Sequence, residues 1–315
     1  MTPRSPSAGA GAPVVTVTLN AALDVTYRVD RLVPHRTHRV SEVRERAGGK
    51  GVNVARLLHA LGQPVRATGL AGGETGARIR ALLATEGVPE SFVPVAAESR
   101  RTVAVVDELD ATGLWEPGPP VLPTEWAAFV AHFAELLPGA AAVVLSGSLP
   151  PGVPDDGYAT LVVAARSAGV PVVLDADGAA LRLAVRAGPD LVKPNETELA
   201  GLAGPVPHDA AVDAVRALGA GAVVASLGAG GLLAATGEGR WRVRPPAGLT
   251  GNPTGAGDAV VAGLVHGLVR RAPWPERLAD AVALSAAAVI APVAGSVARD
   301  DVARLREAVT VEELP

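Results

Sequence analysis

The chain has 315 residues, a formal net charge of −4 at pH 7, 3% aromatic residues and no cysteine. The absence of cysteine excludes disulfides, thiolate metal sites and cysteine nucleophiles, and a chain without disulfides fits the cytoplasm. Basic and acidic residues nearly balance, so the composition indicates neither a nucleic-acid-binding surface nor stacking platforms for bases. This length fits one large α/β domain or two small ones.

We expect neither a targeting signal nor a membrane-spanning segment in this sequence. Residues 1–13 are small and rich in proline and glycine, which predicts a disordered tail. No apolar segment follows Arg4, so we expect no signal peptide. The longest apolar stretch, Ala281 to Ala294, is too short to span a bilayer and contains Pro292. It predicts a buried helix that ends near this proline, and we expect no membrane association.

In the first half of the chain, strands alternate with helices. We expect strands at 14–19 and 65–70, and helices at about 51–61 and 75–86. Two further segments, 39–46 and 101–107, alternate apolar and charged residues. One face of each would meet solvent, so they fit a small β flap better than a buried sheet.

The second half continues with short apolar strands that alternate with helices. The expected strands are 142–146, 171–175, 191–192 and 222–227. The expected helices are 155–168, 181–187, a helix from 196, 212–218, 258–270 and 276–290. This order predicts an α/β fold with a mainly parallel sheet covered on both faces. No linker interrupts it, so 14–315 is expected to form a single domain.

The segment Asn252–Asp258 (NPTGAGD) precedes an apolar helix. Small residues before a helix let backbone N–H groups converge on an anion, and the helix dipole adds positive potential. Asp258 would lie beside that anion as an acceptor. The pairing suits phosphoryl transfer, in which a carboxylate takes the proton of the attacking hydroxyl. The alternative is a glycine turn with Asp258 as the helix N-cap.

A second glycine-rich segment, Gly48–Asn53 (GGKGVN), opens an expected helix. Glycine allows a ligand to approach the backbone closely, and Lys50 and Asn53 offer donors to sugar hydroxyls or phosphate. The segment is not a Walker P-loop, because Lys50 is followed by glycine and the required spacing is absent. The alternative is a strand-to-helix turn with a surface lysine.

Three further motifs follow predicted strands, where ligands bind in open α/β sheets. The hydroxyls of Ser146 and Ser148 can hold a phosphate, although a plain turn has the same pattern. Asn195 and Glu198 can organise waters around Mg²⁺, but a helix capping box has the same spacing. The segment Ser226–Gly231 lacks G-x-G-x-x-G, which argues against NAD binding and leaves a nucleotide-phosphate loop open.

In this order, the motifs resemble those of the ribokinase-like (PfkB) carbohydrate kinases. The resemblance covers about Val14 to Ile290 and rests on TLNAALD (18–24), GGKGVNVAR (48–56), SGSLPPGVP (146–154), VKPNETEL (192–199) and GAGD (255–258). They are most similar to the subgroup that phosphorylates ketohexose phosphates. The resemblance implies a ribokinase-like fold with a β lid at about 27–46 and 101–115, through which such proteins often form homodimers.

The resemblance also implies roles in phosphoryl transfer. Asp258 would deprotonate the acceptor hydroxyl, and the amides of Gly255, Ala256 and Gly257 would stabilise the transferring charge. The cofactors would be ATP and Mg²⁺. The residues that would contact ATP are Lys193, Asn195, Ser226 and Gly228. Asn195 with Glu198 would act on Mg²⁺ through water.

On the substrate side, the resemblance implies a pocket for a phosphorylated sugar. Its residues would be Asp24, Gly49, Lys50, Asn53, Arg100 and Ser148. Arg100 and Ser148 would hold the phosphate already on the sugar, since the guanidinium fork matches phosphate oxygens. Arg101 stands next to Arg100, so the sequence does not decide which of these two arginines would bind the phosphate. A cation loop near Pro292–Val297 would allow stimulation by K⁺, although Val293 supplies no side-chain oxygen.

The implied activity is that of 1-phosphofructokinase, which converts fructose 1-phosphate and ATP to fructose 1,6-bisphosphate. The segment Glu116–Pro119 (EPGP) resembles that branch and the tagatose-6-phosphate branch equally. Tagatose-6-phosphate kinase and 6-phosphofructokinase are therefore the alternatives. A sugar-phosphate sensor without catalysis would not need Asp258. An NAD-dependent oxidoreductase would have to bind nicotinamide.

Overall fold

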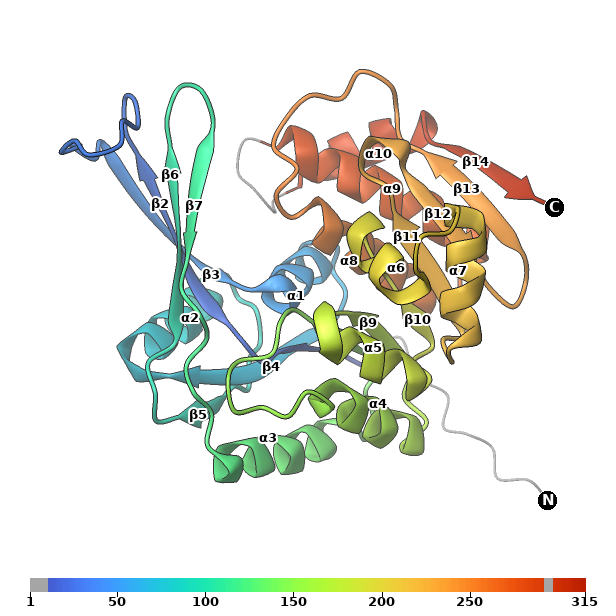
Figure 1. The fold of residues 1–315 in the computed structure, drawn as a ribbon, viewed down its shortest axis with the longest axis horizontal. Coiled ribbons are helices and arrows are strands. Elements are labelled where there is room, and N and C mark those ends of the chain that lie inside the picture. The colour runs from blue at the N-terminus through green and yellow to red at the C-terminus, as the bar shows by residue number, and fades with distance from the viewer. Residues whose placement is uncertain (1–10, 292–296) are drawn as a thin grey trace.

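The computed structural model describes residues 11–291 and 297–315 (Figure 1). Residues 1–10 of the expected tail lie outside the described residues, and so do Pro292 and Val293 of the expected cation loop. In the part of the chain that is described, no helix combines the length and the apolar character that crossing a bilayer requires.

A ten-stranded sheet forms the centre of the fold. Its strands are β1 (Val14–Thr18), β4 (Val65–Gly72), β5 (Val93–Val95), β8 (Ala142–Ser146), β9 (Val172–Asp175), β10 (Leu191–Val192), β11 (Ala222–Ser226), β12 (Leu232–Ala235), β13 (Arg240–Arg244) and β14 (Thr310–Leu314). The order is β14-β13-β12-β11-β10-β9-β8-β1-β4-β5. The strands from β11 to β5 are parallel, and β12, β13 and β14 extend the sheet in antiparallel pairs.

Helices cover both faces of this sheet, which confirms the predicted α/β architecture (Figure 1). One face carries α3 (Pro123–Leu136), α4 (Gly157–Ser167), α5 (Gly178–Arg186), α6 (Glu196–Ala203) and α7 (His208–Ala217). The other carries α1 (Lys50–Ala60), α2 (Gly73–Thr85), α8 (Ala256–Val269) and α9 (Trp274–Ile290), with α10 (Arg299–Glu307) against α9. Both faces of each central strand are therefore buried, which explains the unbroken runs of valine and leucine.

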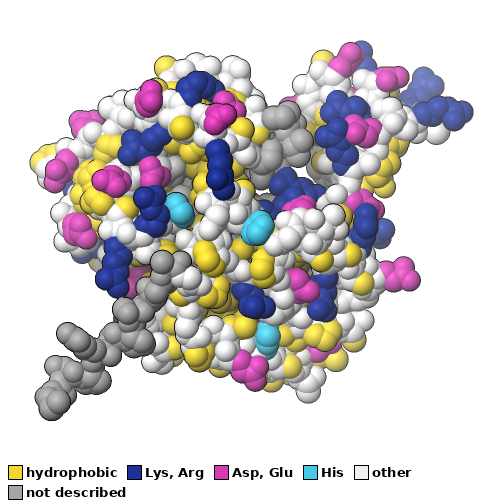
Figure 2. Space-filling model, turned by 180° about the vertical axis from the view of Figure 1, so that it is seen from behind, with side chains coloured by type: hydrophobic (Ala, Val, Ile, Leu, Met, Phe, Trp, Pro, Cys, Tyr) yellow, Lys and Arg dark blue, Asp and Glu magenta, His cyan; other side chains and the backbone are white. Residues whose placement is uncertain are grey.

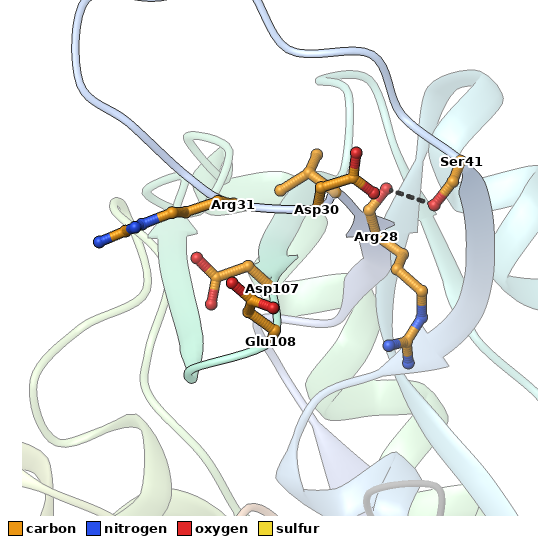
Figure 3. A pocket seen from close by; sticks show the side chains of 7 residues that line it. Arg28, Asp30, Arg31, Ser41, Asp107 and Glu108 are labelled. Carbon is orange, nitrogen blue, oxygen red and sulfur yellow. Dashed lines mark hydrogen bonds between the residues drawn. The ribbon is translucent and has the colours of Figure 1, made fainter.

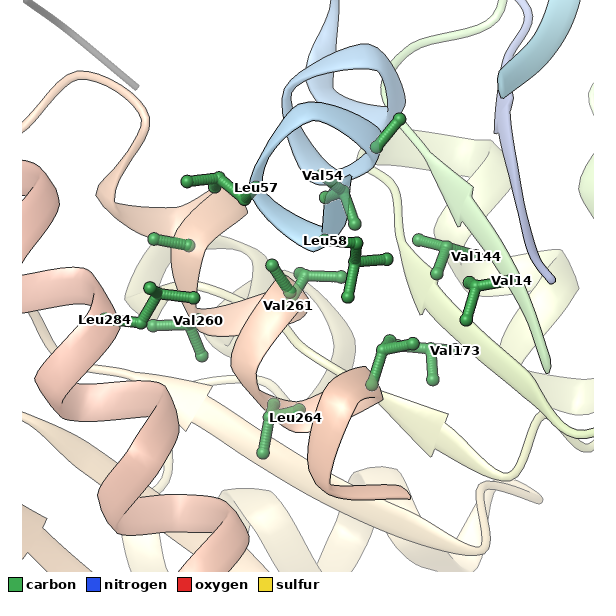
Figure 4. Packing of buried hydrophobic residues seen from close by; sticks show 14 of the residues in the cluster. Val14, Val54, Leu57, Leu58, Val144, Val173, Val260, Val261, Leu264 and Leu284 are labelled. Atoms are coloured by element: carbon green, nitrogen blue, oxygen red, sulfur yellow. The ribbon is translucent and has the colours of Figure 1, made fainter. Parts of the chain in front are cut away.

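The core beneath α1 and α8 fixes the position of the α8 N-terminus. Figure 4 shows Leu58 of α1 and Val261 of α8 beside Val14, Val144 and Val173 of three neighbouring strands. These side chains are 0% exposed. Burial of one such side chain contributes about 1.5–3 kcal/mol. The packing therefore holds the start of α8 at the edge of the sheet where the parallel strands end.

A second, four-stranded sheet forms the lid, which projects from the body of the molecule (Figure 1). Its strands are β2 (Ala22–Arg28), β3 (Glu42–Gly48), β6 (Arg100–Val106) and β7 (Ala111–Trp115), in the order β3-β2-β6-β7. The lid was predicted, but it begins at Ala22 rather than near residue 27. The strand expected from residue 39 begins only at Glu42, because Ser41 bends the chain and donates two hydrogen bonds to the Arg28 carbonyl.

Candidate active site

The predicted site residues meet at one edge of the main sheet. Ser148 follows β8, Lys193 follows β10 and Ser226 ends β11. Asn20, which follows β1 and donates a hydrogen bond to Ser148, was not among the predicted site residues. Asp175, which ends β9, joins them although the sequence did not single it out. Because the parallel strands all end at this edge, residues far apart in the sequence are brought together here.

Asp258 lies in the first turn of α8 and is 7% exposed. The N-cap of this helix is Gly255, with a φ of 84° in the left-handed region that favours glycine. The interpretation of Asp258 as the N-cap is therefore wrong. Burial, followed by the charge of Asp175, raises the pKa of Asp258 to about 7. A carboxyl group with a pKa near neutral pH suits a general base.

The start of α1 brings Asn53 to this carboxylate. Asn53 Nδ2 donates a hydrogen bond to Asp258 Oδ2 at 2.8 Å. Gly49 precedes the helix with a φ of 108°, and a Cβ at this position would stand 2.6 Å from the side chain of Thr18. Only glycine therefore lets α1 approach the end of β1 closely enough for Asn53 to reach Asp258.

Two lysines flank the buried carboxylate of Asp175. Asp175 Oδ1 lies 3.6 Å from Lys50 Nζ and 3.3 Å from Lys193 Nζ. Ser146 Oγ donates to Asp175 Oδ2 at 3.2 Å. The Lys193 side chain is 4% exposed and that of Asp175 is 1% exposed, whereas the Lys50 side chain is 37% exposed. Lys50 is therefore ion-paired with a buried carboxylate, although its side chain stays partly exposed.

Lys50 and Lys193 are the only lysines in a sequence that has 28 lysines and arginines together. The chain thus uses arginine elsewhere and keeps lysine at the two positions that contact Asp175. Burial opposes the charge of Lys50, but the carboxylates of Asp175, Glu198 and Asp258 outweigh it, so the pKa of Lys50 is raised. Both amines are compact point charges, which fit between carboxylates and phosphate oxygens where a planar guanidinium needs more room.

Asn195 and Glu198 form the capping box at the start of α6. Glu198 N donates to Asn195 Oδ1 at 2.9 Å, and Asn195 N donates to Glu198 Oε2 at 2.8 Å. The motif therefore forms the helix capping box, which was the simpler of its two interpretations. Burial raises the pKa of Glu198, and the nearby charges of Lys50 and Lys193 oppose that shift. Glu198 consequently lies within electrostatic reach of both lysines.

The ends of β10 and β11 are joined beside this cluster. Ser226 N donates to the Pro194 carbonyl at 2.9 Å, which places the Ser226 loop next to Asn195. Gly228 follows with a φ of 55°, and a Cβ there would meet nothing within 4 Å. Its left-handed conformation, rather than crowding, therefore requires glycine. The predicted nucleotide residues thus form two adjacent loops.

One backbone N–H group of the turn before α8 is hydrogen-bonded within the turn itself. Ala256 N donates to the Pro253 carbonyl at 3.0 Å, so this predicted donor is engaged within the turn. A Cβ at Gly257 would lie 3.9 Å from Lys193 Nζ. The first turn of α8 and the amine of Lys193 therefore face a common space.

Asp24 lies at the root of the lid, on β2. Its neighbours across the sheet are Arg46 and Thr102. A Cβ at Gly48 would overlap the Asp24 carboxylate, so glycine is needed there for the side chain to fit. Burial raises the pKa of Asp24, and the charge of Arg100 opposes this shift most strongly among the neighbouring groups.

The structure distinguishes the two adjacent arginines of β6. Arg100 Nε donates to the Asn20 carbonyl at 3.1 Å, and Asn20 Nδ2 donates to Ser148 Oγ at 3.1 Å. The Arg101 side chain is 56% exposed and pairs with Glu116 at 3.3 Å. Arg100 is thus the arginine that is linked to Ser148, through Asn20.

Two open cavities lie away from this group. One, of about 410 Å³, is at the outer end of the lid, where Arg28, Arg31 and Asp107 line it (Figure 3). The other, of about 230 Å³, lies between β3, α1 and the end of α2, and Arg56 pairs with Glu86 on its wall. Figure 2 shows basic side chains gathered beside the hollow between lid and body. None of the predicted site residues lines either cavity.

Known proteins that are similar to this chain are carbohydrate kinases. Residues 15–299 match the pfkB family carbohydrate kinases. Phosphofructokinase-2 from Escherichia coli is 31% identical, with a TM-score of 0.89 over 94% of this chain and 98% of that chain. A possible 1-phosphofructokinase from Thermotoga maritima is 30% identical, with a TM-score of 0.87 over 96% of this chain and 99% of that chain. Ribokinase from Arabidopsis thaliana shares the fold, with a TM-score of 0.72 over 94% of this chain and 99% of that chain, at 22% identity.

The fold and these comparisons define an ATP-dependent carbohydrate kinase. The chain belongs to the PfkB family.

Proposed function

We propose that the protein transfers the γ-phosphoryl group of ATP to fructose 1-phosphate and forms fructose 1,6-bisphosphate. The observation that supports a phosphorylated substrate is the cluster of Arg100, Asn20 and Ser148 at the substrate side of the site. It offers a cationic group to a phosphate, separate from the lysines beside Asp258. A kinase for an unphosphorylated sugar would have no use for this second anion site.

In the proposed reaction, Asp258 takes the proton of the attacking sugar hydroxyl. The hydroxyl oxygen bonds to the γ-phosphorus while the bond from that phosphorus to the bridging oxygen breaks, and ADP leaves. Asn53 holds the Asp258 carboxylate in position through its hydrogen bond. Lys50 and Lys193, with the amides of Gly255 and Gly257, would stabilise the negative charge of the transferring group.

The nucleotide is proposed to bind across the loops that carry Lys193, Asn195, Ser226 and Gly228. A Mg²⁺ ion would fit beside Glu198, a half-buried carboxylate next to both lysines. Among the described residues, no group of three or more His, Cys, Asp or Glu side chains is placed to hold a metal. The ion would therefore keep most of its water molecules, as Mg²⁺ commonly does, and would neutralise phosphate charge.

The second candidate activity is that of a 6-phosphofructokinase. The Escherichia coli relative is described in complex with fructose 6-phosphate, and it has nearly the same identity to this chain as the possible 1-phosphofructokinase. Tagatose-6-phosphate kinase activity stays a further alternative. A potassium complex of the Escherichia coli relative is also described. Stimulation by K⁺ and the cytoplasmic location remain predictions for this chain.

The phosphate-binding role of Arg100 predicts a selective loss of substrate affinity. In Arg100→Ala we expect the KM for the sugar phosphate to rise about 10–100-fold, since charged hydrogen bonds contribute about 1.5–3 kcal/mol each. The KM for ATP should change less than about twofold, because Arg100 lies on the substrate side. The matched control is Arg101→Ala, whose side chain pairs with Glu116 on the exposed side. Steady-state kinetics with both substrates varied would refute the role if both KM values rose equally, or if Arg101→Ala behaved like Arg100→Ala.

We also propose that two copies of the chain pair through the lid. Strand register places Val43, Tyr27, Val105 and Leu114 on the lid face opposite to Asp24. Val43 is 57% exposed and Leu114 is 59% exposed, so this apolar face is open to a partner. The Escherichia coli relative is described as a tetramer in an inhibited form.

A charge on this lid face is expected to separate the copies. In Leu114→Asp the dimer should dissociate at least about 10-fold more readily, because the burial of a carboxylate in an apolar contact is costly. Sedimentation velocity at several protein concentrations would measure this change. Leu109→Asp, a change at another exposed leucine, is the control. A wild-type protein that sediments as a monomer at all concentrations would contradict the proposal.

A further inference from the structure

Asn20 joins three distant segments at the substrate side of the site. Its Nδ2 donates to Ser148 Oγ in the loop after β8, and its carbonyl accepts from Arg100 Nε of β6. Arg100 Nη1 also donates to the carbonyl of Glu116, at 3.4 Å, in the segment after β7. Gly118 of the same segment lies over the Asn20 amide, where a Cβ would collide with Oδ1.

The amide oxygen of Asn20 is left without a donor. Asn20 is 8% exposed, and its Oδ1 is buried and accepts no hydrogen bond from the described residues. A buried acceptor that stays unpaired destabilises the fold, so such an atom is uncommon unless a ligand completes it. The segment that carries Gly118 covers this oxygen and is itself half-exposed. A donor can therefore reach Oδ1 from the site only if a small displacement of that segment makes room for it.

The chemistry of Oδ1 restricts what that donor can be. An amide oxygen repels the oxygens of a phosphate, which are acceptors as well, but it accepts readily from a hydroxyl. Arg100 and Ser148, which adjoin Asn20, are the groups proposed to hold the substrate phosphate. A ligand anchored there by its phosphate would present the hydroxyls of its sugar carbons to the neighbouring groups.

We propose that Asn20 determines substrate specificity by accepting, at Oδ1, a hydrogen bond from one sugar hydroxyl close to the phosphate that Arg100 and Ser148 hold. The inference rests on the proposed function, because it takes the ligand to be a ketohexose phosphate. Asn20 thereby distinguishes sugars that differ in configuration at a carbon near that phosphate. A site built around a buried acceptor rejects an analogue that lacks the matching hydroxyl strongly, since the acceptor then stays unpaired.

The test compares the ketohexose phosphate that the wild-type protein phosphorylates with its 3-deoxy and 4-deoxy analogues and its 2,5-anhydro analogue. In the wild type we expect kcat/KM to fall about 10–100-fold for one of the three analogues. In Asn20→Ala the penalty for that same analogue should shrink to less than about threefold, while the KM for ATP stays unchanged. A merely structural role would lower activity on the parent sugar and all analogues in parallel.

A second variant keeps Asn20 intact. In Gly118→Ala the backbone can accept alanine, because φ there is not in the left-handed region, but the methyl group would collide with Oδ1 and must displace the Asn20 amide. We expect it to raise the KM for the sugar phosphate about 10-fold and leave the KM for ATP unchanged. Equal penalties for every analogue in wild type and Asn20→Ala, or an unchanged sugar KM in Gly118→Ala, would overturn the assignment. A wild-type protein that phosphorylates no ketohexose phosphate would instead overturn the proposed function, and Asn20's role with it.

Discussion

Replacing Asp258 with asparagine is expected to lower kcat by about 10²–10⁴-fold, the range that a general base contributes. Asparagine keeps the shape of the side chain but cannot take the proton of the attacking hydroxyl. The KM for ATP should change little. The fold should persist, because the substitution removes a buried charge and creates no cavity. Steady-state kinetics and a thermal melt of the same samples measure both effects, and retained turnover would refute Asp258 as the base.

The raised pKa of Asp258 adds a pH signature. The base works only when ionised, so kcat should rise with pH through about 7 and level off above it. Stability follows the opposite direction. A folded-state pKa above the value of 3.8 expected for the unfolded chain means that stability falls as pH rises from about 4 to 7. Asp258→Asn should therefore melt higher than wild type at about pH 8, and this gain should shrink as the pH is lowered to about 5.

The second large effect is expected from Asp175→Asn. The change leaves the amine of Lys193, whose side chain is 4% exposed, without its carboxylate partner. Removing one partner of a buried ion pair costs about 3–5 kcal/mol, and the loss here should lie near the lower end because Lys50 is partly exposed. We also expect kcat to fall about 10²–10³-fold, because Lys50 and Lys193, which are proposed to stabilise the transferring charge, lose the carboxylate that positions them.

The control for this variant is Asp177→Asn, an exposed carboxylate two residues away. It should leave both the melting temperature and kcat within error of wild type. The charge of Asp175 also raises the pKa of Asp258, together with burial, while Asn53, Lys50 and Lys193 oppose the shift. The pH at which the residual activity of Asp175→Asn is half-maximal should therefore move downward. An unchanged pH profile with a normal kcat would show that Asp175 has no part in the site.

The central architecture could be predicted because a parallel strand that is buried on both faces needs an unbroken apolar run. The strand β8 shows this, since it runs from Ala142 to Ser146 and all five of its residues are buried. The strands β13 and β14 escaped prediction because they lack such a run. β14 (TVEEL) is mostly exposed and charged, and it gains its place only by pairing with β13. The strand propensity of a segment predicts little where pairing with a neighbouring strand determines its structure.

The candidate site was predictable where a residue stands in a glycine-rich motif or at a strand end, as Asp258 and Lys193 do. Asp175 also ends a predicted strand, but its ion pairs were not predictable, since its partners Lys50 and Lys193 are far from it in the sequence and only the fold brings them together. The choice between Arg100 and Arg101 also needed the fold. Adjacent residues of a strand point to opposite faces, so only the position of β6 in the lid shows which guanidinium faces Asn20.

The most direct test of the proposed function is ATP-coupled ADP release with a panel of acceptors. The panel holds fructose 1-phosphate, fructose 6-phosphate, tagatose 6-phosphate, free fructose, ribose and adenosine. We predict that turnover concentrates on fructose 1-phosphate and disappears in Asp258→Asn. Turnover confined to an unphosphorylated acceptor would contradict the phosphate-binding role of Arg100 and Ser148, and turnover on none of these acceptors would contradict the proposed activity as a whole.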